Sequence, residues 1–495
     1  MRIDRPILAG LLVVAGALAP RAGAAQEECR AAVEPAQHPA RGFTLTMEAR
    51  QYEIGGRPFV TNVYNRSFVG PTLTMEPGER MDLNVINRMT ATDDQPDSVT
   101  TWTNAHYHGF AVTPDSSGGD NVTQVHIPRG GRRHYDFLLP RGHSQGMYWY
   151  HPHPHGSTGS QVAGGLSGAL LVGSILSYFP QYTTVRVRER TLLIRDMSFN
   201  LMSSKRLLNV NGKVCSTWSI RPGEHQLWHI GNFGANQFVN LKLQGLKWTL
   251  LAMDADRVAK PIETDSLWIP PGSRAEVIVT GPPAGTRAAL YAAPFYPSNS
   301  ADVMGVTLGY LVSAGLPRTE PLRAPLGEDR DVLDTVAFLR NATDVEKHTF
   351  RFGFPGQVTA AVNDTIYAPG NLPVNVPWGK VQEWTIVNTT PALHTFHIHQ
   401  TDMLVMSING KPVPFETLRD NVPVGVTRVG GDPVGDTVVV RFVFDRIAAG
   451  PFVFHCHVLQ HEDEGMMHNV CVYDPDDPDG VNKCNRMFAG GGGHH

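Results

Sequence analysis

The chain has 495 residues, a formal net charge of -4, and only 18% charged residues. A charge balance this weak excludes electrostatic attraction of nucleic acid or of an anionic membrane as a main function, and favours small-molecule partners. The length is enough for roughly three domains, each with its own hydrophobic core.

Residues 1–25 have the pattern of a secretory signal peptide. Arg2 and Arg5 precede an apolar run over residues 7–19, and the small residues at 22–24 resemble a cleavage site. The run is too short for a membrane anchor, and without an adjacent arginine pair it favours general secretion over twin-arginine export. We therefore expect an exported protein, periplasmic or extracellular, with no membrane span in the mature chain.

The remaining chain is predicted to be all-β and to contain a threefold repeat. Its 49 Gly and 37 Pro residues are spread along the sequence, which indicates many turns. Runs rich in β-branched residues, such as 275–279 and 437–444, are typical of strands in β-sandwiches. Turns at residues 77–79, 222–224 and 377–379 each precede a predicted strand, and these strands end at Asn87, Asn232 and Asn388.

Four principal His-x-His pairs lie in the first and third repeats, whereas the second repeat carries none. On a strand, residues i and i+2 point to the same face, so each pair can present two imidazoles to one site. The sequence therefore predicts one polynuclear metal site between the first and third domains, with the middle domain as a spacer. Its eight candidate ligands are His106, His108, His151, His153, His397, His399, His455 and His457.

Cys456 lies between two of these histidines, so its side chain is expected to point to the opposite side of the strand. A Cys, a His five residues on, a Met five residues beyond that and a second His match the ligands of a blue copper centre. Structural zinc prefers four closed ligands and would not use ten histidines in two connected groups. Cys456, His461 and Met466 therefore indicate copper.

These motifs, in this order and over nearly the whole exported chain, resemble those of three-domain multicopper oxidases, the laccase-like family, and especially its bacterial branch. The resemblance implies three cupredoxin-like Greek-key β-sandwich domains at residues 41–177, 178–318 and 325–485, followed by a flexible tail at 486–495. Tyr107, Thr395 and Gln400 depart from the usual family motifs, which affects fine geometry and redox potential rather than metal binding.

The same resemblance implies four copper ions and a ligand set for each. The type 1 ligands would be His394, Cys456, His461 and Met466. The type 2 copper would be held by His106 and His397, and the type 3 pair by the other six histidines of the cluster. An axial Met466 predicts a low to moderate potential for the type 1 site.

The family reaction couples one-electron oxidation of a donor to reduction of dioxygen to water. The resemblance places proton-relay acids at Asp120 and Glu462, although a turn Asp and a solvated Glu are equally compatible with the sequence. Only 15 scattered methionines are present, which favours a phenolic or aromatic amine donor over Cu(I). The alternatives are a cuprous or other metal-ion oxidase, and a copper-binding cupredoxin protein without turnover.

The other cysteines and histidines receive ordinary interpretations. Four further cysteines could form two disulfides whose pairing the sequence leaves open; these are Cys29, Cys215, Cys471 and Cys484. The other eleven of the 21 histidines are expected to be core or surface residues. His155 is the closest case, because it continues the alternation of His151 and His153, and His494 and His495 fall in the tail.

Overall fold

The computed structural model describes residues 29–92, 95–183, 185–197, 207–295, 305–318, 328–357, 359–414, 417–429 and 432–489. The expected signal peptide and the residues from 490 onward, with His494 and His495, lie outside these ranges. Within the ranges, the helices are all too short or too polar to cross a lipid bilayer.

The first sandwich packs two sheets over residues 37–172. One sheet has the order β10 (Arg132–Leu138), β6 (Arg80–Arg88), β3 (Arg41–Ile54), β4 (Arg57–Tyr64). The other has the order β2 (Gln37–Pro39), β5 (Thr72–Met75), β12 (Gly168–Val172), β11 (Gly146–His151), β8 (His106–His108). Along β6 every second side chain is buried, as expected where one face of a sheet covers a core.

The second sandwich contains one strand from the N-terminal end of the described chain. One of its sheets has the order β1 (Arg30–Ala31), β15 (Ser216–Ile220), β23 (Val306–Ser313), β22 (Arg287–Ala293), β17 (Val239–Leu243), β20 (Leu267–Ile269). The other has the order β14 (Leu207–Val210), β13 (Arg188–Met197), β16 (His225–Asn232), β21 (Arg274–Thr280), β18 (Trp248–Met253), β19 (Asp256–Thr264). A disulfide between Cys29 and Cys215 fixes β1 to this sandwich, although β1 precedes the first domain in sequence.

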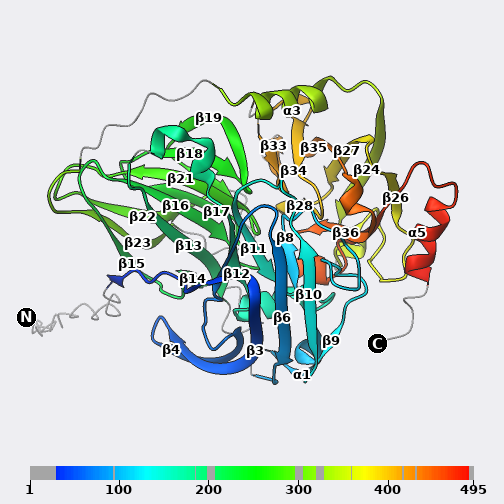
Figure 1. Ribbon diagram of the computed structural model, residues 1–495, viewed down its shortest axis with the longest axis horizontal. Coiled ribbons are helices and arrows are strands. Elements are labelled where there is room, and N and C mark those ends of the chain that lie inside the picture. Colours follow the sequence, from blue (N-terminus) through cyan, green and yellow to red (C-terminus); the bar gives the residue numbers. More distant parts are fainter. Residues whose placement is uncertain are drawn as a thin grey trace, which may run out of the picture.

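The third sandwich contains the C-terminal strands. One of its sheets has the order β25 (Ala361–Val362), β24 (Val345–Gly353), β27 (Val381–Asn388), β35 (Thr437–Val443), β29 (Met403–Ile408), β30 (Lys411–Pro412), and β31 (Leu418–Arg419) also pairs with β29. The other has the order β26 (Val374–Pro377), β37 (Met467–Tyr473), β36 (Gly450–Cys456), β28 (His394–Ile398), β32 (Asn421–Val424). Figure 1 shows the three sandwiches in sequence colours, with β8 and β11 of the first beside β28 and β36 of the third.

Helices and short ribbons join or cover the sandwiches. They are α1 (Asp97–Thr100), α2 (Thr158–Gly164), α3 (Arg330–Asn341), α4 (Leu459–Asp463), α5 (Gly480–Ala489), and the ribbons β7 (Trp102–Thr103) with β9 (Ile127–Pro128) and β33 (Val426–Val429) with β34 (Asp432–Gly435). A second disulfide, between Cys471 and Cys484, fixes α5 to β37. The expectation of a tail from 486 is corrected, because α5 continues through Ala489.

The three repeat units predicted from the turns form equivalent strands, namely β6, β16 and β27. In each, the side-chain oxygen of the final asparagine accepts from the backbone N–H two residues on, and the side-chain amide donates to a backbone carbonyl further along the chain. The acceptors are Ile127 O for Asn87, Gln237 O for Asn232 and Ala392 O for Asn388. The repeat therefore encodes a shared strand-to-loop corner, which explains why asparagine ends each unit.

His229 gives the middle sandwich a pH-dependent ion pair. Its Nδ1 lies 2.6 Å from Glu276 Oε1 and its Nε2 lies 3.5 Å from Glu189 Oε2. Burial alone would lower the pKa of His229, but the two carboxylates outweigh it and raise the pKa to about 9. The pair therefore stabilises the fold fully below the unfolded pKa of about 6.5, and this stabilisation is lost as the pH rises through 9.

We expect the free energy of unfolding of the copper-free protein to fall by up to about 3 kcal/mol between pH 6.5 and 10 on account of this group. Urea unfolding at a series of pH values measures the fall. His229→Gln should show a flatter dependence, and an identical slope in both proteins would contradict the assignment.

Candidate metal centres

Neighbouring strands bring the cluster histidines together in cross-strand pairs. In the first sandwich His106 lies opposite His151 on β8 and β11, and in the third His397 lies opposite His455 on β28 and β36. All eight cluster histidines are buried. Their ring nitrogens converge in three groups, each with its atoms within 4.8 Å of one another: His106, His108, His397; His108, His151, His457; and His153, His399, His455.

The cluster lies where the first and third sandwiches meet. His106 stacks on His399 and His108 stacks on His397, each pair with ring centroids 3.9 Å apart. Nearby, the carboxylate of Asp463 in α4 accepts hydrogen bonds from the backbone N–H groups of Thr158 and Gly159 in α2. Each of these contacts joins one residue of the first sandwich to one of the third, so the cluster exists only when the two are docked.

The hydrogen bonds of the rings leave lone pairs directed at a common space. His151 Nδ1 donates to Pro152 O at 2.9 Å and His397 Nδ1 donates to Asp420 O at 2.8 Å, while the Nε2 atoms of both rings have no partner. Buried polar atoms without partners are costly and rare, whereas a ligand histidine commonly uses its second nitrogen for such a bond. The donor set therefore fits metal ions.

A second observation supports the same conclusion. His455 Nε2 lies 3.1 Å from His153 Nε2 and 3.4 Å from His399 Nε2. Burial lowers the pKa of His153 to about 4, so its ring is neutral at neutral pH. Neutral imidazoles whose lone pairs face one another repel unless a cation lies between them, and neutral imidazole is the form that binds metal.

The two predicted acids lie beside cluster histidines. Asp120 is fully buried, with its two carboxylate oxygens 3.1 and 2.9 Å from His106 Nδ1, and burial raises its pKa to about 8. Glu462 lies 3.0 Å from His455 Nδ1 and 3.5 Å from His153 Nδ1. Burial would raise the pKa of Glu462, but these two imidazoles hold it at about 2. Neither acid is an ordinary surface residue.

Cys456 forms a separate site on the other side of β36. Its Sγ lies 3.4 Å from His394 Nδ1 and 3.6 Å from His461 Nδ1, which is the His₂Cys arrangement of a blue copper centre. Met466 packs with Cys456 in the hydrophobic core of the third sandwich, and its backbone oxygen accepts from Cys456 N. Burial raises the pKa of the thiol to about 12, so a metal ion must displace its proton on binding.

His155 lies outside these groups. Across the described ranges, the four ligand groups do not include it, and its ring instead contacts Tyr367 with centroids 4.8 Å apart. The expected set of histidines and Cys456 is thus brought together in two places, without a further member.

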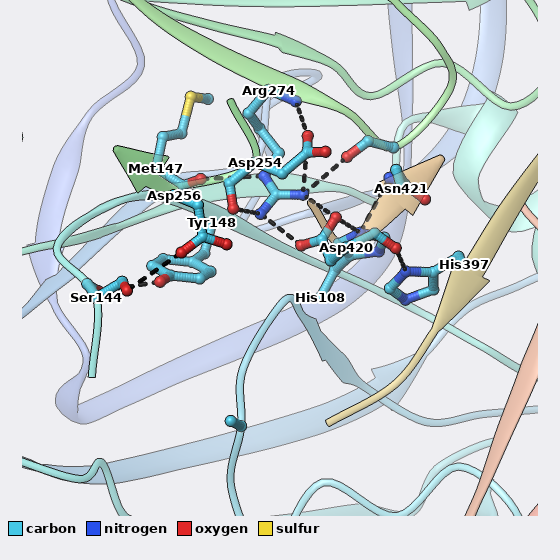
Figure 2. Close-up of polar contacts among 12 residues, drawn as sticks. His108, Ser144, Met147, Tyr148, Asp254, Asp256, Arg274, His397, Asp420 and Asn421 are labelled. Carbon is cyan, nitrogen blue, oxygen red and sulfur yellow. Dashed lines mark hydrogen bonds and ion pairs between the residues drawn. The ribbon is translucent and has the colours of Figure 1, made fainter. Parts of the chain in front are cut away.

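The structure adds two residues that the sequence did not single out, Arg274 and Asp420. Figure 2 shows the buried Arg274 guanidinium facing the Asp420 carboxylate, with His108 and His397 beside Asp420. A charged residue opening a strand rich in β-branched residues was the one available signal for Arg274, whereas no local pattern marked Asp420. The expectation that the middle domain is only a spacer is therefore incomplete, because Arg274 of the middle sandwich contacts Asp420 beside the histidine cluster.

Gly272 of the middle sandwich packs directly against the cluster. It has φ +86°, and a Cβ there would lie 2.5 Å from Asn421 Nδ2 and 2.9 Å from His457 Nε2. Gly285 has a similar φ of +85°, but a Cβ there would meet nothing within 4 Å. The two glycines therefore share the backbone strain of an alanine substitution and differ in the collision.

We expect Gly272→Ala to lower the free energy of unfolding by about 1–3 kcal/mol more than Gly285→Ala, the usual cost of overpacking. It should also reduce the copper bound per chain, because His457 must move. Thermal unfolding and metal analysis of the two variants test this, and equal losses in both would contradict it.

Comparison with known proteins agrees with this geometry. Residues 46–175, 182–311 and 335–476 each match a family described as multicopper oxidase. The multicopper oxidase mco of Staphylococcus aureus is 24% identical over 449 residues, which cover 87% of this chain and 88% of that protein.

Solved structures share the fold. A multicopper oxidase from Campylobacter jejuni, described as a metallo-oxidase, superposes with a TM-score of 0.72 at 23% identity and covers 90% of this chain and 95% of its own. A laccase from Pediococcus acidilactici superposes with a TM-score of 0.73 at 21% identity, covering 91% and 95%. The expected all-β fold of three cupredoxin-like domains is confirmed. With all three of its domains matched, the chain belongs to the multicopper oxidase family, whose members are copper-dependent oxidases.

Proposed function

We propose that this protein oxidises phenolic or aromatic amine donors one electron at a time and reduces dioxygen to water, using four copper ions. One ion would bind at His394, Cys456, His461 and Met466, and three among the eight cluster histidines. The observation that carries the proposal is the placement of Cys456, which is covalently joined to His455 and His457 while its thiol faces the other site. A donor site and an oxygen site are thereby separated by one short stretch of β36.

Bound copper supplies reversible one-electron storage, and four ions together hold the four electrons that dioxygen reduction requires. The polypeptide has three tasks beside this. It presents His461, the most exposed of the histidines around Cys456, toward a donor. It excludes bulk water from the buried cluster, and it supplies protons there.

Asp120 and Glu462 are suited to the proton task in different ways. With a pKa of about 8, Asp120 holds a proton at neutral pH beside His106, whereas Glu462, with a pKa of about 2, is ionised between His153 and His455. Acid and base roles follow when neighbouring environments separate two pKa values in this way. We assign proton delivery to Asp120 and proton transfer from solvent to Glu462.

The surroundings of the Cys456 site favour an aromatic donor. The Phe354 ring lies 5.7 Å from the His394 ring and 5.3 Å from the His461 ring, so an apolar aromatic surface adjoins the exposed ligand. Cu(I) would call for exposed methionines, but among those in the described ranges only Met406 and Met487 reach the surface. The metallo-oxidase description of the Campylobacter jejuni structure supports a metal-ion donor, Cu(I) or another, as the second candidate.

We also propose that the protein is exported, to the periplasm or the cell exterior. The disulfides Cys29–Cys215 and Cys471–Cys484 support this, because such bonds persist in oxidising compartments. They agree with the signal-peptide pattern of residues 1–25.

Oxygen consumption by the copper-loaded mature protein tests the proposal, with a phenol in one arm and Cu(I) in the other. We expect uptake driven by the phenol. Uptake with Cu(I) alone would make the protein a metallo-oxidase, and uptake with neither donor would refute turnover. A redox titration should give a low to moderate potential for the Cys456 site, as an axial Met466 predicts.

A further inference from the structure

The described residues of the middle sandwich supply no candidate ligand, yet its Arg274 reaches the junction of all three sandwiches. This first residue of β21 is fully buried. Its Nε donates to Met147 O of the first sandwich at 3.0 Å, and its Nη2 donates to Asp254 O of its own sandwich at 2.9 Å. Figure 2 shows the guanidinium directed at the carboxylate of Asp420 in the third sandwich.

Every N–H of this guanidinium has an acceptor. Nη1 donates to Asp420 Oδ1 at 2.8 Å and to Gly272 O at 3.2 Å, and Nη2 donates to Asp420 Oδ2 at 2.7 Å. With Met147 O and Asp254 O, the five donors of the arginine fork are all used. A two-pronged (bidentate) contact of this kind fixes the orientation of the carboxylate plane and also neutralises the carboxylate charge.

Asp420 in turn contacts two cluster histidines through two different groups. Its carboxylate Oδ1 lies 3.2 Å from His108 Nε2, and its backbone oxygen accepts from His397 Nδ1 at 2.8 Å. The unpaired nitrogens are therefore Nδ1 on His108 and Nε2 on His397. Asn421 Nδ2 also lies 3.2 Å from His108 Nε2. Asp420, with its neighbour Asn421, thus leaves Nδ1 of one ring and Nε2 of the other, in two stacked imidazoles, facing the metal space.

The chain packs closely around this contact. Gly109, which follows His108, has φ +86°, and a Cβ there would lie 2.5 Å from Asp420 Oδ2 and 2.8 Å from Arg274 Nη2. The glycine after the first His-x-His pair is therefore required by the ion pair behind the ligands.

We propose that Arg274 is a positioning residue of the copper cluster: by fixing Asp420, the middle sandwich sets the ring orientation and tautomer of His108 and His397. This inference rests on copper in the cluster, as in the proposed function, but not on the identity of the donor. Partners that orient ligand histidines typically change metal affinity about 10- to 100-fold when they are replaced.

Arg195 offers a matched control. It is a second buried arginine of the middle sandwich, on β13, and it donates to Phe68 O, Gly165 O and Ser167 O of the first sandwich. Like Arg274 it joins the middle sandwich to the first, but its acceptors are backbone oxygens away from the cluster ligands, and it makes none of these bonds to the third sandwich.

The experiment compares Arg274→Gln with Arg195→Gln. Copper per chain is measured at graded free copper, the visible thiolate absorption reports the Cys456 site, and thermal unfolding of the copper-free proteins reports stability. Both variants are expected to lose stability. Only Arg274→Gln should need about 10- to 100-fold more copper to fill the cluster, with the thiolate absorption unchanged. Equal cluster affinity in the two variants would overturn the proposal.

The double variant Arg274→Gln with Asp420→Asn separates positioning from stability. It removes both buried charges, so the copper-free protein should regain stability, while the two-pronged contact stays lost. Cluster affinity should therefore remain low, and recovery of affinity together with stability would overturn the positioning role. Where Arg274→Gln does not fold, Arg274→Lys keeps the charge without the fork, and wild-type affinity in that variant would overturn the proposal.

The wild-type protein distinguishes failure of the two proposals. If it fills the cluster and both arginine variants do so equally well, only the positioning role fails. If wild-type protein takes up copper at Cys456 alone, the four-copper function fails, and the positioning role fails with it.

Discussion

Replacing Cys456 with serine is expected to reduce phenol-driven oxygen uptake to the background rate. A hydroxyl is a poor ligand for the site formed with His394 and His461, whose nitrogens lie 3.4 and 3.6 Å from the sulfur. The substitution also removes the thiolate through which the donor site joins His455 and His457. Copper per chain should fall by about one ion and the visible thiolate absorption should disappear, because the cluster ligands remain in place.

The double variant Cys471→Ser with Cys484→Ser is the control for this loss. It alters two other cysteines of the same sandwich, which form a disulfide and have no part in either site. It should lose stability, by about 2–4 kcal/mol, yet keep oxygen uptake at temperatures where it is folded. Uptake that survives Cys456→Ser would contradict the assignment of the donor site.

Replacing Glu462 with glutamine is expected to slow oxygen uptake about 100-fold or more, the usual range for loss of a group that transfers protons. The carboxylate lies 3.0 Å from His455 Nδ1 and 3.5 Å from His153 Nδ1. Glutamine cannot take up and release a proton, and its neutral amide removes the carboxylate charge that faces the two imidazoles. The effect should appear in the rate at saturating phenol, since the donor site is unchanged.

Glu464→Gln is the matched control, because Glu464 lies two residues further on and its carboxylate accepts from Gln460. Its uptake rate and copper content should equal those of the wild type. Copper analysis of Glu462→Gln must accompany the kinetics, and a rate equal to that of Glu464→Gln would refute the proton role. A rate loss matched by copper loss would place Glu462 among the residues that hold the cluster rather than among those that move protons.

The sequence was sufficient where function depends on local spacing. The alternation of His455, Cys456 and His457 predicted two sites on opposite sides of one strand, because side-chain direction on a strand has a period of two. The repeated turns likewise predicted β6, β16 and β27.

It was insufficient where function depends on contacts between distant segments. Arg274 and Asp420 are separated by 146 residues, and neither lies in a motif whose spacing reveals the other. The pairing of Cys29 with Cys215, 186 residues apart, was open for the same reason. These contacts form only when the three sandwiches dock, and the side-chain periodicity of a single strand does not predict how sandwiches dock.

The two proposed copper sites differ in how much of the protein must be assembled before they exist. The residues of the Cys456 site all come from the third sandwich, so that site is complete once this sandwich has folded. The cluster instead joins residues as far apart as His153 and His455, 302 positions along the chain. Metallation as proposed therefore has an inherent order, in which the ions added last would act as a removable crosslink between the first and third sandwiches.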